Sequence, residues 1–167
     1  GEFNLYGTET MRYAAVQDTS SRIWSQVSNG FNNSVLAMVS FGSDLVAGGS
    51  FTASGNDSLF RVARYNGTSW SPLGQGFNDD VYALAVFNNE LYAAGNFTSS
   101  GSTPINYIAK WNGSSWVALG SGTNNFINAL TVYNGELYAG GAFTNAGGTP
   151  CSRIAKWNGS SWSAVGS

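Results

Sequence analysis

Short apolar segments recur along this chain, and none of them follows the 3.6-residue period of an amphipathic helix. In residues 81–87, VYALAVF, both alternating sets are apolar, which is typical of a strand buried on both faces. ELYAAGNF (90–97) follows after Asn-Asn, and Asn-Gly-Ser-Ser joins INYIAKW (105–111) to WVALG (116–120). Asn-Gly between apolar runs favours a hairpin, because both residues tolerate positive φ. The pattern predicts four antiparallel strands.

This unit repeats every 46 residues. SVLAMVSFGSDLVAGGSFTASG aligns without a gap with DVYALAVFNNELYAAGNFTSSG and with FINALTVYNGELYAGGAFTNAG. The second predicted strand ends in small residues in each copy, at 48–49, 94–95 and 140–141, where they permit close backbone approach. Repeats of this length with four short strands predict an all-β fold, a β-propeller segment of four-stranded antiparallel blades.

The repeat divides the chain into three full blades and one incomplete blade. Residues 31–77, 78–123 and 124–167 are predicted to form blades 2, 3 and 4, and residues 1–30 the end of the second strand and the third and fourth strands of a first blade. Such an arc exposes a sheet face at each end, whereas propellers of four to eight blades close. We therefore expect one propeller domain within a longer chain or, alternatively, an assembly in which other copies add the missing strands, head to tail or as a filament.

The segment LYAGGAF followed by IAKWNGSSW resembles a kelch-type repeat, with a double glycine after an apolar strand, then an aromatic residue, then a tryptophan. The fuller pattern, GG-x-F-T, I-A-K-W-N-G and W-x-x-L-G-x-G, is similar to the propeller repeats of fungal cortical polarity-marker proteins and of large bacterial surface proteins. The likeness covers about residues 31–167. It implies the architecture and a surface location rather than an activity, because one propeller scaffold hosts many functions.

Composition argues against several classes of function. The net charge is −2 and the basic residues are scattered, which argues against a nucleic-acid partner. No apolar run approaches 18 residues, so no membrane insertion is expected. The chain has no histidine, which removes Ser-His-Asp and Cys-His catalysis, zinc sites of the HExxH type, most copper or iron centres and the copper chemistry known on the kelch scaffold. We predict no enzyme activity, no catalytic residues, no cofactor and no metal.

Charged residues recur at equivalent positions of successive units. The acids precede the second strand and the basic residues lie in the third: Asp44, Glu90 and Glu136, and Arg64, Lys110 and Lys156. We expect the acids to be turn residues that pair with a neighbouring blade, and the basic stems to cover apolar surface. Asp79 and Asp80 are adjacent and unrepeated, which makes a weak calcium site, and a solvated loop is expected there. Cys151 is expected to be a small buried apolar residue.

Asparagine sequons bear on location. The candidate glycosylation sites are Asn32, Asn56, Asn66, Asn96, Asn112 and Asn158. Several lie in predicted turns, which are exposed, so the sequons predict accessible acceptors if the chain passes through a eukaryotic secretory pathway. With the acidic composition and the resemblance to surface proteins, they favour an extracellular or cell-surface location.

Two hypotheses for function come from different classes. The first is a non-enzymatic scaffold and interaction surface whose partners are proteins, either the rest of a longer chain or other copies. The alternative is a lectin-like propeller that binds glycans through repeated aromatic residues, with these candidates: Trp70, Trp111, Trp116, Trp157 and Trp162. Sugar binding requires an open indole face beside polar groups, so burial of the tryptophans separates the two. A third hypothesis is a fragment of a propeller enzyme whose catalytic residues lie outside this chain.

Overall fold

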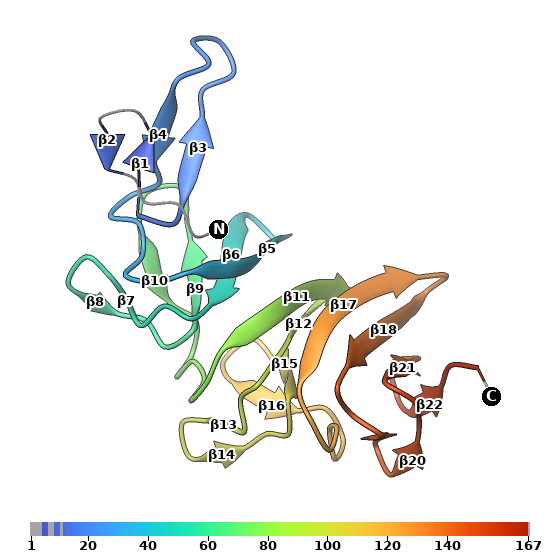
Figure 1. Ribbon diagram of the computed structural model, residues 1–167. Coiled ribbons are helices and arrows are strands. Elements are labelled where there is room, and N and C mark those ends of the chain that lie inside the picture. Colours follow the sequence, from blue (N-terminus) through green and yellow to red (C-terminus); the bar gives the residue numbers. More distant parts are fainter. Residues whose placement is uncertain (1–4, 7–8, 11, 167) are drawn as a thin grey trace.

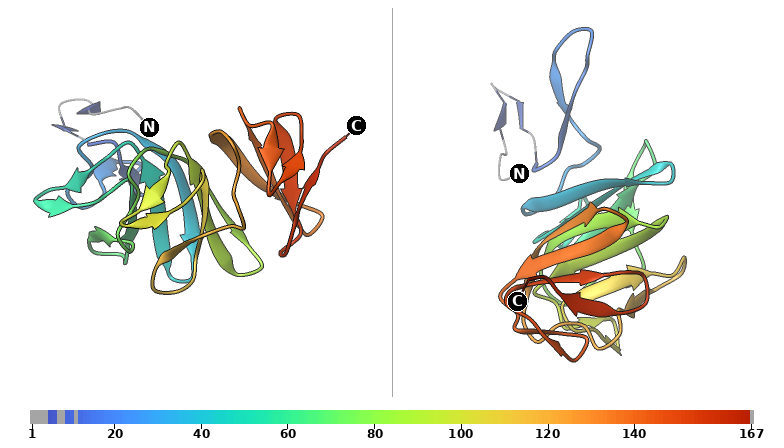
Figure 2. Two further views of the ribbon diagram at one scale, coloured as in Figure 1. Left: turned by 90° about the horizontal axis from the view of Figure 1, so that it is seen from below. Right: turned by 90° about the vertical axis from the view of Figure 1, so that its right-hand side faces the viewer.

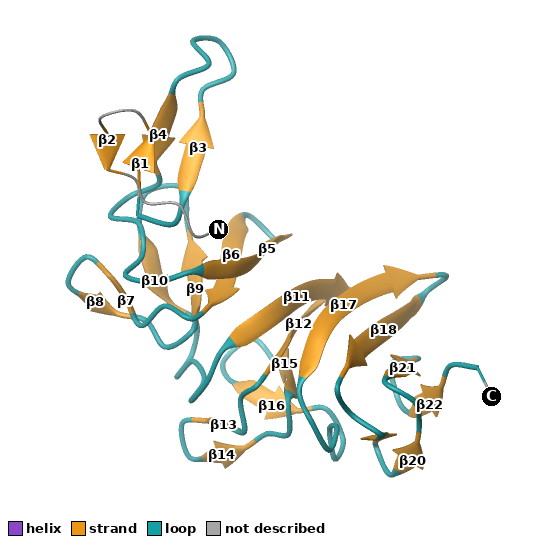
Figure 3. Cartoon of the chain, in the orientation of Figure 1, coloured by secondary structure: helices purple, strands orange, loops and turns teal. Residues whose placement is uncertain are grey.

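The structure, a computed structural model, describes residues 5–6, 9–10 and 12–166, and every regular element within them is a β-strand (Figures 1 and 3). Three four-stranded antiparallel sheets follow one another, as predicted, and we call them blades 2, 3 and 4. Their strands are β5 (Val35–Phe41), β6 (Asp44–Gly49), β9 (Val62–Tyr65) and β10 (Trp70–Pro72); β11 (Val81–Phe87), β12 (Glu90–Gly95), β15 (Ile108–Trp111) and β16 (Trp116–Ala118); and β17 (Ile127–Tyr133), β18 (Glu136–Gly141), β21 (Ile154–Trp157) and β22 (Trp162–Ala164).

An incomplete first blade precedes these sheets. It contains β3 (Ala15–Gln17) and β4 (Trp24–Gln26), which pair antiparallel, and a small hairpin of β1 (Leu5–Tyr6) and β2 (Glu9–Thr10). Among the described residues β3 has one hydrogen-bonded neighbour, β4, whereas the third strand of each full blade has two. The predicted end of a second strand falls on residues 1–4, outside the described residues.

A two-stranded hairpin separates the second and third strands of every full blade and was not predicted. These hairpins are β7 (Ala53–Ser54) with β8 (Asp57–Ser58), β13 (Ser99–Ser100) with β14 (Thr103–Pro104), and β19 (Asn145–Ala146) with β20 (Thr149–Pro150). The third strand of blade 3 also begins at Ile108 rather than at 105. The reason is Tyr107, whose φ of 65° is incompatible with an extended strand.

The second residue of each small-residue pair must be glycine because the backbone of its own blade leaves no room for a side chain. A Cβ built on Gly49, Gly95 or Gly141 would lie 2.1, 2.0 or 2.3 Å from the carbonyl oxygen of residue 34, 80 or 126 respectively. Each of those carbonyls belongs to the residue immediately before the innermost strand of the same blade. The predicted close approach of backbones is therefore confirmed, and a side chain at these positions would separate the first two strands.

The blades stack face to face, with β11 between β5 and β17 (Figures 1 and 2). We call the side of a blade that meets the preceding blade its leading face, and the opposite side its trailing face. In blade 3, Leu84 and Val86 join the apolar cluster shared with blade 2, and Ala85 and Phe87 join the cluster shared with blade 4. The prediction that residues 81–87 pack on both sides is thus confirmed, and the core consists of the layers between blades.

An asparagine before each innermost strand clamps the loop that follows the second strand. In blade 3, Asn78 Oδ1 accepts the amide N–H groups of Thr98 and Ser99 at 2.8 and 2.9 Å, and its Nδ2 donates to Thr98 Oγ1 at 2.9 Å. Asn32 and Asn124 make the same three contacts in their own blades. This clamp satisfies loop amides that lie outside the sheet ladder.

Candidate interaction faces at the ends of the blade stack

The interface between blades 2 and 3 shows what a completed interface looks like. Val46 from β6 packs in one buried cluster with Leu91 of β12 and with Trp116, which is 2% exposed. Trp116 Nε1 donates to the Leu73 carbonyl at 2.9 Å, so this indole joins the two blades by a hydrogen bond as well as by apolar contact. The layer is therefore closed to solvent and its polar group is satisfied.

A polar latch borders the same interface. Arg61, just before β9, contacts Asp80 Oδ1 at 3.0 Å through Nη1, and Ser50 Oγ donates to Asp80 Oδ2 at 2.8 Å. Asp79 Oδ2 accepts Asn96 Nδ2 at 2.8 Å. Asp79 and Asp80 lie in a loop, as expected, but they are half-buried and hydrogen-bonded rather than fully solvated. In the described part of the chain no three His, Cys, Asp or Glu side chains are grouped so that they could hold a metal ion.

No described residue covers the trailing face of blade 4 as blade 3 covers that of blade 2. We call it the C-terminal face and define it by these residues: Ala129, Thr131, Tyr133, Tyr138 and Ile154. Tyr133 is 62% exposed and Ile154 is 38% exposed, whereas their equivalents in blade 3, Phe87 and Ile108, are 2% and 0% exposed. Tyr133 and Tyr138 contact each other edge to face, with ring centroids 6.0 Å apart. The face therefore presents apolar and aromatic groups at positions that the repeat buries.

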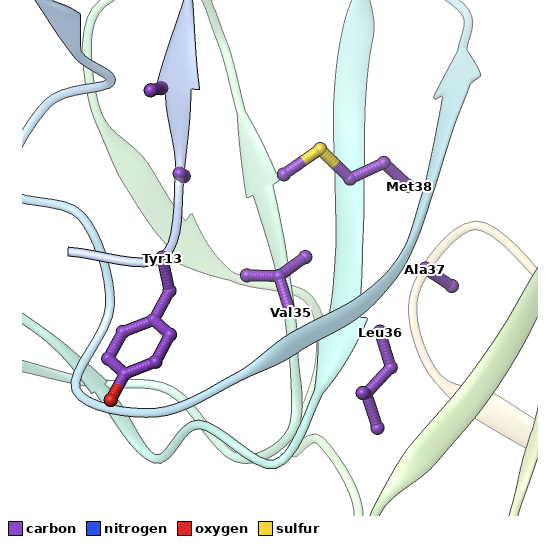
Figure 4. Close-up of a pocket in the computed structure, with 7 residues that line it drawn as sticks. Tyr13, Val35, Leu36, Ala37 and Met38 are labelled. Carbon is purple, nitrogen blue, oxygen red and sulfur yellow. The ribbon is translucent and has the colours of Figure 1, made fainter. Parts of the chain in front are cut away.

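A second opening, which we call the N-terminal cleft, lies between the incomplete first blade and blade 2. One pocket of about 230 Å³ is lined by residues 13–15 and 35–38, with Tyr13 leading into β3 and Met38 on β5 (Figure 4). A neighbouring pocket of about 480 Å³ shares Ala15 and Met38 and extends to Trp70. Leu36 and Met38 are 43% and 45% exposed. The cleft thus lies between β3 and the innermost strand of blade 2.

The recurring ion pairs form within blades rather than between them. Lys110 Nζ lies 2.8 Å from Glu90 Oε1, and Lys156 Nζ lies 2.8 Å from Glu136 Oε2. Asp44 and Arg64 make a looser pair at 3.8 Å. The expected pairing of the acids with a neighbouring blade is therefore wrong. The register explains the difference, because the second and third strands of a blade are neighbours and place these residues on adjacent strands.

Hydrogen bonding and burial shift several pKa values in these layers. Hydrogen bonds from Lys110 and Tyr92 lower the pKa of Glu90. Burial, followed by the hydrogen bond to Glu90, raises the pKa of Tyr92, and the bond to Glu136 raises the pKa of Lys156. Burial also raises the pKa of Cys151, which is half-buried against the cluster between blades 3 and 4. The ion pairs thus favour the charged forms of Glu90 and Lys156, and burial favours the neutral forms of Tyr92 and Cys151.

The tryptophans proposed as sugar contacts lie mainly between blades. Trp70, Trp116, Trp157 and Trp162 are buried, and Trp111 is half-buried across the ring of Trp116, with centroids 5.4 Å apart. Trp70 Nε1 donates to the Val27 carbonyl at 3.3 Å. Trp162 Nε1 is buried without an acceptor in the described residues. Because their faces are engaged in packing, these indoles lack the open platform on which the lectin hypothesis depends.

The structure divides the sequons into two groups. Asn66, Asn112 and Asn158 are exposed, and the Oδ1 atom of each accepts two amide N–H groups of its own turn. Asn56 is exposed in the turn of the β7–β8 hairpin. In contrast, Asn32 Nδ2 donates to Thr52 Oγ1 and Asn96 Nδ2 donates to Asp79 Oδ2, each at 2.8 Å. A glycan on either of these two nitrogens would compete with a structural hydrogen bond.

Comparison with known proteins adds no family: no family model matches the sequence, and no curated protein matches it significantly. Among the described residues there is also no helix long and apolar enough to cross a membrane.

Proposed function

We propose that the chain is a non-enzymatic β-propeller module of an extracellular or cell-surface protein, and that it acts as a structural scaffold and interaction surface. Its partners are other blades of the same repeat, in other copies of the chain or in the rest of a longer one. The observation that carries this proposal is the exposure of Tyr133 and Ile154 on the C-terminal face, at positions that are buried in blade 3, together with the apolar lining of the N-terminal cleft. Exposed apolar patches of this kind mark interaction sites.

The chemistry of the faces supports a protein partner. Val16, Leu36 and Met38 border the cleft with apolar side chains, and β3 offers a strand edge with a single neighbour in the described residues. An unpaired edge beside an apolar groove is suited to strand addition. Burial of the tryptophans removes the observation that favoured sugar binding, so we do not propose a lectin. The extracellular location rests on the exposed sequons and on the resemblance to surface propeller repeats.

Self-association of the purified chain tests the proposal. Sedimentation velocity over a wide concentration range is expected to show assembly of the unmodified chain. Ile154→Glu on the C-terminal face and Met38→Glu in the N-terminal cleft should each abolish it, because either change places a charge in the contact. Phe60→Glu is the matched control, since Phe60 is 53% exposed but lines neither opening. A chain that stays monomeric at every concentration would contradict association between separate copies, and an equal loss of assembly with Phe60→Glu would contradict the assignment of the contact to these two surfaces.

A further inference from the structure

Two residues that border the C-terminal face repeat those of blade 2 rather than those of blade 3. Blade 4 carries Gly140 and Arg153 where blade 2 carries Gly48 and Arg61. The corresponding positions 94 and 107 of blade 3 hold alanine and tyrosine. The trailing side of blade 4 is therefore chemically closer to that of blade 2, whose partner is visible in the structure.

In blade 2 these two residues contact the start of the next blade. A Cβ built on Gly48 would lie 2.5 Å from Val81 Cγ1, so the absence of a side chain makes room for that valine. Arg61 Nη1 contacts Asp80 Oδ1 at 3.0 Å. Blade 2 thus accommodates the Val81 side chain at Gly48 and pairs the Asp80 carboxylate with Arg61, both at the start of β11. Because Arg61 and Asp80 are each about a quarter exposed (24% and 26%), their attraction is only partly screened by solvent.

The interface between blades 3 and 4 uses a different combination. There the next blade begins with Phe126 and Ile127, and Ala94 joins the buried cluster around Ile127. Phe126 also meets Tyr82 edge to face, with ring centroids 6.3 Å apart. Neither Tyr107 nor Phe126 can form an ion pair. At these two interfaces, a blade with glycine and arginine is followed by a blade that begins with Asp-Val. A blade with alanine and tyrosine is followed by one that begins with Phe-Ile.

Blade 4 holds its arginine in the conformation that Arg61 adopts. The φ values of Arg153 and Arg61 are 65° and 66°. The carbonyl of Arg153 accepts the N–H of Gly141 at 3.0 Å, and Nη1 donates to the Ala142 carbonyl at 3.5 Å. Arg61 makes both equivalent contacts, to Gly49 N and to the carbonyl of residue 50. The backbone and the loop carbonyl thus orient the two guanidinium groups alike.

The described residues supply no such partner to blade 4. Arg153 is exposed and has no carboxylate partner in the described part of the chain. A Cβ built on Gly140 would meet nothing within 4 Å. Ile154 is paired with Gly140 across the neighbouring strands. Ile154 is 38% exposed, whereas its equivalent in blade 3, Ile108, is fully buried.

We propose that the C-terminal face binds a β-blade whose innermost strand is entered through an Asp-Val pair like Asp80 and Val81, and that it discriminates against a blade entered through Phe-Ile. The aspartate pairs with Arg153, the valine fills the space at Gly140, and the blade covers Tyr133 and Ile154. Ala142 replaces Ser50, so the aspartate has one donor fewer than in blade 2 and depends more on the arginine. This inference rests on the proposed role of the face as an interaction surface and adds the chemistry of the blade that the face prefers. In another copy of this chain Asp80 and Val81 already pack against that copy's blade 2, so self-association of the unmodified chain uses the face without this pair.

Two extended chains of equal length test the selectivity. In one, a copy of residues 76–121 follows Ser167 in the register of the repeat, which places an Asp-Val blade after blade 4. In the other, a copy of residues 122–167 places a Phe-Ile blade there. Each is made with and without Arg153→Ala, and the first is also made with Asp80→Asn in the appended copy only. Hydrogen exchange of residues 127–141 and 154–157 reports docking, and urea unfolding reports stability.

We expect the Asp-Val extension to slow exchange of these residues at least tenfold relative to the unmodified chain, and the Phe-Ile extension to slow it less. Arg153→Ala should weaken docking of the Asp-Val extension up to about fivefold, which is the range of a partly exposed ion pair, and leave the Phe-Ile extension unchanged. In the Asp-Val extension, the effects of Arg153→Ala and Asp80→Asn on docking should not be additive, because both changes remove the same ion pair.

Equal protection by the two extensions, stronger protection by the Phe-Ile blade, or no protection by either would overturn the inference. An Arg153→Ala effect of the same size in the Asp-Val extension, its Asp80→Asn form and the Phe-Ile extension would also overturn it. Failure of the proposed function is distinguishable, because docking of the extension is intramolecular. If the unmodified chain never self-associates while the Asp-Val extension docks, the selectivity of the face stands and its role between separate copies falls.

Discussion

The layer between blades 3 and 4 and the C-terminal face of blade 4 contain equivalent residues in opposite surroundings. Phe87 is 2% exposed and Tyr133 is 62% exposed, although both end the innermost strand and both strands pair in the same register. The strands of a blade therefore pair in the same register with or without a following blade, whereas burial of the trailing-face side chains requires one. The comparison locates the stability of this fold between the blades, as in other repeat architectures where neighbours bury each other's faces.

The largest difference is expected from aromatic truncation. Trp116→Ala removes a buried indole that joins blades 2 and 3 and should cost about 3–5 kcal/mol of unfolding free energy. Tyr133→Ala on the C-terminal face should change it by no more than about 0.5 kcal/mol. Urea unfolding followed by circular dichroism measures both. Similar losses would mean that Tyr133 is covered in solution, and the comparison between a closed layer and an open face would fail.

Adding a methyl group at the first glycine of the pair sharpens the comparison at a single repeat position. Gly48→Ala forces a Cβ against Val81 and should destabilise the chain by about 1–3 kcal/mol. Gly140→Ala meets open space and should be neutral or stabilise the chain by up to about 1 kcal/mol, since alanine restricts the unfolded state. Thermal unfolding of the two variants is the measurement. A destabilising Gly140→Ala would show that something already packs there.

The asparagine clamps should not distinguish the two regions, because each is made within its own blade. Asn78→Ala and Asn124→Ala each remove three hydrogen bonds to a loop and should each cost about 1–2 kcal/mol. Asn112→Ala, which changes an exposed turn, serves as the control and should cost less. If Asn124→Ala proved much milder than Asn78→Ala in urea unfolding, blade 4 would be loosened internally, and its exposure would not be a matter of a missing neighbour alone.

The smallest effect is expected from tyrosine ionisation. Burial raises the pKa of Tyr92, so its neutral form is favoured in the folded chain. Stability from this group is complete below the pKa of an unfolded tyrosine, about 10, and is lost as the pH rises through the higher folded value. Tyr92→Phe should therefore flatten the alkaline fall in unfolding free energy above about pH 10. Tyr138→Phe, the equivalent change on the C-terminal face, is the control, and an equal flattening in both variants would refute the assignment.

Much of the fold could be predicted from the period of 46 residues, because alternating apolar sets and Asn-Gly turns recur at fixed positions. The short hairpins such as β13–β14 were missed, since two-residue strands carry no alternation. The Arg61 to Asp80 latch was missed because Asp80 is unrepeated, so the period gave no signal for it. The clamp of Asn78 on Thr98 was detectable, because both residues recur with the period.

The candidate site was harder to predict than the fold. An aromatic pair such as Trp111 and Trp116 has the same sequence whether it faces solvent or another blade, and only the stacking decides between packing and binding. The unfilled side of blade 4 became identifiable once blade 2 showed what Gly48 and Arg61 contact. Sequence repetition therefore predicted the interfaces, and the structure showed which of them have no partner among the described residues.

Covalent footprinting of side chains at low and high concentrations of the unmodified chain tests the central claim most directly. If the C-terminal face is an interaction surface for further blades, Tyr133 and Ile154 should react readily when dilute and become protected when concentrated, while Phe60 reacts equally in both. Unchanged reactivity of Tyr133 and Ile154, or protection that extends equally to Phe60, would contradict the account.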